Sequence, residues 1–97
     1  MLAVATASTV TAHSWAKADY RSAKFLVKFE TATHSEVSEV LLTLDGSDNI
    51  AITEYALVGT NGNLGNVSAD VSGSDVRLRV TTLNNSTDVM VYGTLLV

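Results

Sequence analysis

Apolar and polar residues alternate with a period of two along much of the chain, which is the spacing of a half-buried β-strand. The alternation is clearest in Val67–Val71 and Val76–Val80. Between them lies a short polar segment in which Gly73 can take the positive φ of a tight turn. The pattern predicts an antiparallel hairpin with a buried face formed by Val67, Val71, Leu78 and Val80.

The opposite face of this hairpin is polar. Arg77 and Arg79 lie on it in one strand, and Ser68 and Asp70 lie across the turn in the other. We expect both arginines to be exposed and to form a cross-strand ion pair with the acidic side.

Two further runs carry the same signal. Phe25, Val27 and Phe29 share one face of a strand that covers about residues 20–30, and Val40, Leu42 and Leu44 alternate in the next one. In the run over residues 50–58 the apolar positions are even at first and odd later. This change of parity predicts a β-bulge near Thr53 and Glu54.

The two ends of the chain differ from this pattern. Residues 88–97 are apolar on both faces, which predicts a central strand or one that lies under a partner. The first dozen residues are uncharged and rich in threonine without clean alternation, so we expect an N-terminal arm over residues 1–12 and a β-sandwich over residues 13–97. About seven strands separated by turns predict an all-β fold, a single antiparallel β-sandwich.

Composition agrees with this class and excludes several functions. Thirteen valines, two isoleucines and twelve threonines make 27 of the 97 residues β-branched, which favours sheets. A net charge of −4 with only six basic residues argues against nucleic acid as a partner. No run reaches the ~20 apolar residues of a membrane-spanning helix, so we expect no membrane insertion. The chain has no cysteine, which removes thiol chemistry and cysteine metal sites.

Candidate catalytic residues are few. His13 and His34 stand outside any recognisable motif, and we expect both to be solvated surface residues. The carboxylates are scattered, and no nucleophile with a base can be assembled. We therefore expect no catalytic residue, no cofactor and no enzymatic activity.

Two binding alternatives stay open. Asp45–Asn49 gathers oxygen-bearing side chains around Gly46, which would suit a calcium ion but is also a common turn sequence. A glycan platform is the other alternative, because aromatic rings stack on sugars when they converge on one surface. Its candidate rings are those of Trp15, Tyr20, Tyr55 and Tyr92.

The order of several phrases resembles one known family. Tyr20-Arg21-Ser22-Ala23-Lys24, then Thr53-Glu54-Tyr55, then Leu64-Gly65 before the polar hairpin are similar to the small β-sandwich module of virion structural and tail-fibre-like proteins of tailed phages, cyanophages in particular. The resemblance covers about residues 15–97. It implies a structural role in the virion without catalysis, and it implies that Glu54 is satisfied by a partner such as Arg21 or by backbone amides.

The expected function is therefore that of a non-enzymatic virion protein, as a decoration, neck or tail-fibre module. It would act through self-association or contacts with other virion proteins. The alternative is a receptor-binding or glycan-binding module that recognises a host-surface glycan. Because the chain has no proline to protect its sheet edges, we expect an interface. Its expected residues are Leu2, Val4, Val10, Tyr92 and Leu96.

Overall fold

The computed structural model describes residues 1–97 and contains eight β-strands and no helix. The strands are β1 (Leu2–Val4), β2 (Thr9–Ala16), β3 (Ser22–Glu30), β4 (Ser35–Leu44), β5 (Ile50–Gly59), β6 (Gly65–Ser72), β7 (Asp75–Thr82) and β8 (Thr87–Leu96). No helix is present that could cross a membrane.

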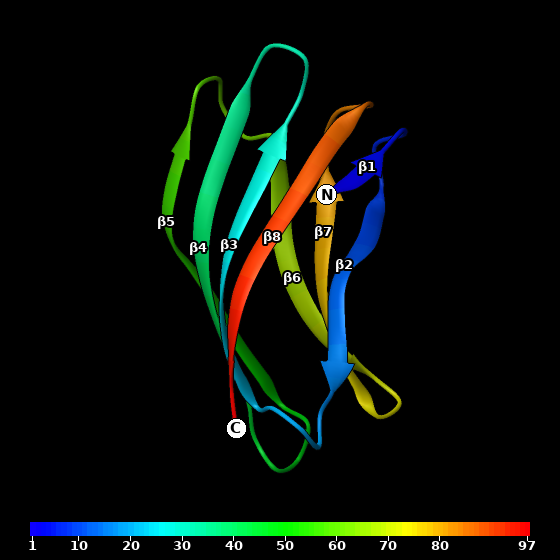
Figure 1. Ribbon diagram of the computed structural model, residues 1–97, viewed down its shortest axis with the longest axis vertical. Helices are drawn as coiled ribbons and strands as arrows, with labels where there is room; N and C mark the ends of the chain where they lie inside the picture. The colour runs from blue at the N-terminus through cyan, green and yellow to red at the C-terminus, as the bar shows by residue number, and fades with distance from the viewer.

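The strands form two antiparallel sheets of unequal width. One has five strands in the order β1-β8-β3-β4-β5, and the other has three in the order β2-β7-β6. The smaller sheet lies behind the larger one in Figure 1 and is offset toward β8 and β1. The all-β antiparallel sandwich is therefore confirmed, with eight strands where about seven were expected.

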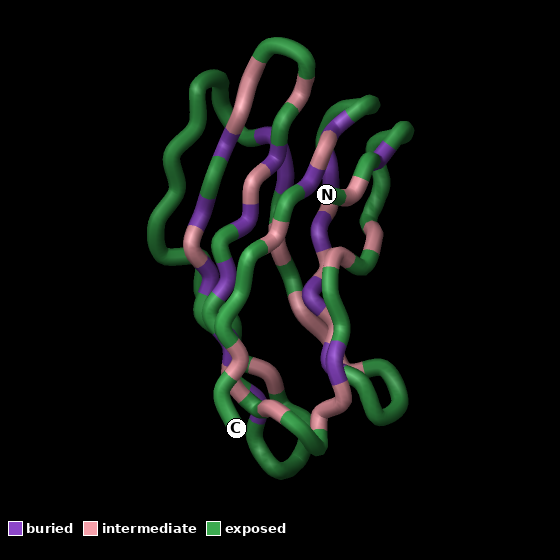
Figure 2. The backbone as a smooth tube through the Cα atoms, in the orientation of Figure 1, coloured by how far each residue is buried: buried purple, intermediate pink, exposed green.

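The core lies between the sheets and is built from the alternating residues of the central strands. Fourteen apolar side chains are buried in one cluster, with Phe25 and Phe29 the largest of the fully buried ones. Figure 2 shows buried positions alternating with half-buried or exposed ones along β3, β4 and β7. The predicted inner faces of β3 and β4 are confirmed, since all six of their predicted core residues are buried.

The hairpin of β6 and β7 has the predicted register, with Val67 opposite Val80 and Val71 opposite Val76. Gly73 takes a φ of +60° in its two-residue turn. Two burial predictions were wrong in degree. Val67 and Val71 are half-buried because β6 is an edge strand, and Arg77 and Arg79 are half-buried rather than exposed.

The predicted bulge in β5 is confirmed, one residue beyond the expected site. Glu39 pairs with Ala56 and Val40 with Glu54, which leaves Tyr55 as the extra residue. Side chains before and after the bulge therefore reach the inner face with opposite parity, as the sequence pattern indicated.

The expected N-terminal arm is not a separate element. Leu2–Val4 pairs with β8, and Thr9–Ala16 pairs with β7 along its length. A register shift between Thr11 and His13 leaves Ala12 as an extra residue, so Val10 and Trp15 both face inward. This bulge is the physical reason why the segment shows no clean alternation.

Two glycines make room for the large rings of β3. A Cβ atom added to Gly93 would lie 2.4 Å from the ring of Phe25, and one added to Gly65 would lie 2.6 Å from the ring of Phe29. Gly93 sits directly opposite Phe25 in the pairing of β3 with β8. Both rings therefore pack against bare backbone, and no larger residue fits at either glycine without a shift of the core.

We expect Gly93→Ala to lower the free energy of unfolding by about 1–3 kcal/mol, because the added methyl group overpacks the core. Gly46→Ala is the matched control, since its nearest neighbour would be at 3.6 Å. Urea titration of both variants checks this. Equal stability of the two would show that the ring of Phe25 does not occupy the space over Gly93.

Candidate interaction surfaces

The outer faces of the two sheets differ in chemistry. On the three-stranded sheet the outward positions of neighbouring strands are aligned by the register, and almost all are polar. They include Thr9, Thr81, Asn66, Thr11, Arg79, Ser68, Ser14, Arg77 and Asp70. This face has the composition expected of a surface in contact with water.

An ion pair holds the centre of that polar face. Arg77 donates two hydrogen bonds to the carboxylate of Asp70, at 2.7 and 2.6 Å. These bonds are the main cause that lowers the pKa of Asp70 below its ordinary value. The expected cross-strand pair is thus present, with Arg77 as the donor, whereas Arg79 on the same face forms no ion pair and its buried Nε has no hydrogen-bond partner.

The outer face of the five-stranded sheet carries many large apolar side chains. We name it the outer face, and define it by the exposed residues that the register of β3, β4, β5 and β8 places on one side: Leu26, Val37, Leu41, Val58, Met90, Tyr92 and Leu96. Tyr92 is 73% exposed and lies directly opposite Leu26. An exposed apolar patch of this kind is typical of a contact surface.

Four charged residues of the outer face form two ion pairs, and Asp88, opposite Glu30, stays unpaired. Lys28 and Glu30 form an ion pair at 2.9 Å, and Lys24 and Glu39 approach to 3.7 Å. The hydroxyl of Tyr55 donates a hydrogen bond to Glu39, and this bond is the main cause that raises the pKa of Tyr55. A partner could therefore cover this face without leaving a large uncompensated charge.

A shallow groove of about 390 Å³ crosses the end of the outer face near the C-terminus. Leu41, Thr53 and Leu96 line it, together with Lys24. The lining is apolar, so the groove could accept an aliphatic or aromatic side chain from a partner.

The expected interface residues divide between the inside and the outside of the sandwich. Val4 is buried, and Leu2 and Val10 pack against the core, so these three side chains belong to the inner face. Tyr92 and Leu96 are exposed on the outer face. The sequence missed the other members of that face, which the alternation in β3 and β4 could have revealed.

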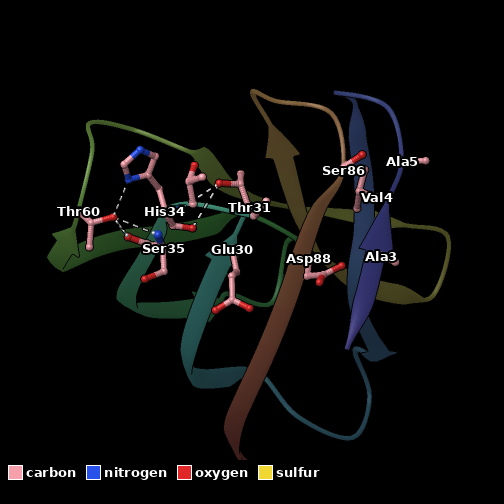
Figure 3. A pocket seen from close by; sticks show the side chains of 12 residues that line it. Ala3, Val4, Ala5, Glu30, Thr31, His34, Ser35, Thr60, Ser86 and Asp88 are labelled. Carbon is pink, nitrogen blue, oxygen red and sulfur yellow. Dashed lines mark hydrogen bonds between the residues drawn. The ribbon is translucent and has the colours of Figure 1, made fainter.

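A cleft of about 910 Å³ lies at the end of the sandwich where the β3–β4 loop faces β1 (Figure 3). Its lining is mainly threonine, serine and alanine, with Glu30 and Asp88 facing each other across β3 and β8. Hydroxyl groups are suited to hydrogen bonding with a polar ligand such as a glycan.

His34 lies at the surface in this cleft, as expected, and is half-buried there. Its Nδ1 lies 3.2 Å from Oγ1 of Thr60, and the N–H of Ser35 donates to the same oxygen at 3.1 Å. Figure 3 shows the three residues together on one wall of the cleft. Thr60 thereby ties the β5–β6 loop to the start of β4.

His13 also makes specific contacts, although it is exposed. Its ring lies 5.7 Å from that of Trp15 and 6.1 Å from that of Phe25. The bulge at Ala12 turns His13 toward the inner face, which the sequence pattern did not predict.

The Asp45–Asn49 loop adopts the turn that was one of its two interpretations. The carboxylate of Asp45 accepts hydrogen bonds from the backbone N–H groups of Ser47 and Asn49 and from the side chain of Asn49. The bonds from Asn49 are the leading causes that lower the pKa of Asp45. Asp48 is bound to Lys17 at 2.9 Å, so both carboxylates are already engaged.

The aromatic residues do not converge on one surface. Trp15 is buried and donates a hydrogen bond to the backbone carbonyl oxygen of Tyr20. The side chain of Tyr20 packs against the core. Tyr55 and Tyr92 are exposed but lie on strands that β3 and β4 separate. A stacking platform for a sugar is therefore not formed by these four rings.

The sequence missed a buried carboxylate at the loop end. Glu36 is 2% exposed, and its carboxylate accepts a hydrogen bond of 2.7 Å from the backbone N–H of Leu64. This bond anchors the start of β6 beneath β4. The sequence pattern around Glu36 does not predict its burial, because the N–H group that its carboxylate binds belongs to a residue 28 positions away.

No family model matches the chain, and no curated protein matches it at a significant level.

We expect Glu36→Ala to destabilise the domain by about 1–3 kcal/mol, because the buried N–H of Leu64 loses its acceptor. Glu36→Gln should lose less, since the amide oxygen can still accept. Glu30→Ala, at an exposed carboxylate, serves as the control. Chemical denaturation ranks the three variants, and an equal loss for Glu36→Ala and Glu30→Ala would contradict the anchoring role.

Proposed function

We propose that this domain is a non-enzymatic structural component of a phage virion that works by binding another virion protein or a second copy of itself. The main support for this proposal is the composition of the outer face. Seven large apolar side chains are exposed there, while the corresponding face of the other sheet is polar. The resemblance to tailed-phage modules supports the virion as the setting.

The geometry of the outer face favours a protein partner. The face is one side of an open sheet, its ion pairs are internal, and its aromatic and aliphatic side chains are exposed. Such a surface fits another sheet or a broad protein patch. A lasting contact needs to bury at least about 1,000 Å² in total.

A receptor- or glycan-binding role is the second candidate. The hydroxyl-lined cleft at the loop end favours it, because Thr31, Thr60 and Ser86 all lie along its walls. Saturable binding of a host-surface polysaccharide that disturbs these residues would support this candidate.

We expect the isolated protein to self-associate with increasing concentration and Leu26→Lys to weaken the association at least about tenfold, because a lysine in the centre of the contact must lose its hydration. Leu83→Lys is the matched control, since Leu83 is exposed to a similar degree but lies between β7 and β8. Sedimentation velocity measures both variants.

Lysine labelling of purified particles covers the case of a different virion partner. Lys24 and Lys28 should be protected in particles relative to the free protein, while Lys17, which is not on the outer face, should react in both. A monomer in solution together with full reactivity of Lys24 and Lys28 in particles would contradict the proposal.

A further inference from the structure

A second uncovered apolar surface lies between the sheets, where β5 projects beyond β6. We name it the seam. The register shows which side chains face it, because Val40, Leu42 and Leu44 of β4 are buried and lie opposite inward-facing residues of β5. The seam is lined by Ile50, Ile52, Glu54 and Leu57 of β5 and by Val67, Ala69 and Val71 of β6.

Within the seam, Ile50 and the three β6 residues are half-buried against the core, whereas the inward-facing residues of β5 beyond Ile50 are not covered. Leu57 is 53% exposed and Ile52 is 36% exposed, and every residue from 51 to 59 is exposed. Figure 2 shows β5 exposed along its length beside the alternating pattern of β4. In Figure 1 no strand of the smaller sheet lies behind β5, because that sheet ends at β6.

The free edge of β6 borders the seam. β6 pairs with β7 alone, so its other edge presents unpaired backbone N–H and C=O groups over Gly65–Ser72. A strand added there would gain backbone hydrogen bonds and would also cover the apolar residues of β5. The combination of a free edge with an adjacent apolar face is what strand addition uses.

The seam also has unsatisfied polar groups. Ser38 lies opposite Leu57, is 3% exposed, and its hydroxyl has no hydrogen-bond partner. Glu54 faces the seam between Ile52 and Leu57, and its carboxylate has no ion pair or hydrogen bond. The expected contact of Glu54 with Arg21 or backbone amides is absent.

The charge of the seam specifies what can fill it. At one end a cleft of about 540 Å³ is lined by Ile50, Ala69 and Val71 together with Asp48 and Asp70. Those two aspartates are paired with Lys17 and Arg77, which leaves Glu54 as the uncompensated charge. An apolar partner would bury that charge without a counter-charge, which is unfavourable, whereas a partner cation would compensate it.

The overhang of β5 limits the shape of the partner. A second copy that continued the smaller sheet past β6 with its apolar side inward would bring its own five-stranded sheet onto the same side. The five-stranded sheet of the second copy would then have to lie in the same layer as β5 and β4 of the first copy. The two sheets would collide, because β5 already extends beyond β6 in that layer. A single extended segment has no such covering sheet and fits.

We propose that the seam binds one extended segment of a partner protein, which adds a fourth strand to β6, places apolar residues at alternate positions under β5, and sets a lysine or arginine opposite Glu54. This inference does not depend on the virion assignment. It uses a different surface from the outer face, so both contacts can be made at once.

Two synthetic peptides test the proposal. Each has nine residues, blocked ends and alternating threonine and valine, with either lysine or glutamate replacing the central valine. We expect the lysine peptide to bind the full-length protein at least about tenfold more tightly than the glutamate peptide. In NMR titrations the shifted amides should lie in Asn66–Ser72 and Ile52–Leu57.

A charge reversal separates a specific contact from general attraction to an acidic protein. Glu54→Lys should reverse the preference between the peptides, while Asp19→Lys, which changes the net charge equally at an exposed turn, should preserve it. No binding, equal binding of both peptides, or amide shifts confined to the outer face would overturn the proposal. Dimers that dissociate in Glu54→Lys would also overturn it, since they would assign the seam to a second copy.

Discussion

A sheet of three strands cannot cover a sheet of five, and this mismatch governs the rest of the structure. The smaller sheet covers the central strands, where β3 and β4 bury their large apolar residues, and it stops at β6. β5 keeps its hydrogen bonds to β4 but makes few contacts with the opposite layer beyond Ile50. The apolar residues Ile52 and Leu57 on its inner side therefore stay exposed.

The core accordingly depends on a small number of close contacts. Phe25 and Phe29 extend from the middle of the large sheet over Gly93 and Gly65, so that one ring packs on its neighbouring strand and the other on the opposite sheet. These contacts hold β8 in register with β3 and fix β6 beneath it. Trp15 closes the cluster from β2, with its ring 5.7 Å from that of Phe25.

The sequence predicted the faces of individual strands better than their arrangement. Alternation is a local property, so it identified the inner faces of β3, β4 and the hairpin, and the parity change in β5 located the bulge within one residue. β5 alternates like a covered strand although only Ile50 packs against the core, because coverage depends on which strands join the smaller sheet. The burial of Glu36 was missed for the same reason, because its hydrogen-bond partner is distant in the sequence. The pairing of β2 with β7 in the smaller sheet was missed because the bulge at Ala12 breaks the alternation.

The candidate surfaces were foreseen in part for a similar reason. Tyr92 and Leu96 were recognised because their strand is apolar on both sides, and the structure leaves both exposed. Leu2, Val4 and Val10 have the same composition but turn inward, because β1 and β2 complete the edges of the two sheets. The seam had no sequence signal beyond Glu54, whose missing partner becomes evident only when the strands are in place.

Amide hydrogen exchange of the isolated protein tests the coverage mismatch most directly. Exchange in an edge strand with few packed neighbours proceeds by local opening, whereas exchange in the core requires global unfolding. The account predicts that the amides of β5 that are hydrogen-bonded to β4 exchange much faster than those of β3 and β8, although β5 pairs with β4 along its length except at the Tyr55 bulge. Protection of β5 equal to that of β3 in the monomer would contradict it, because β5 would then be as well packed as the core.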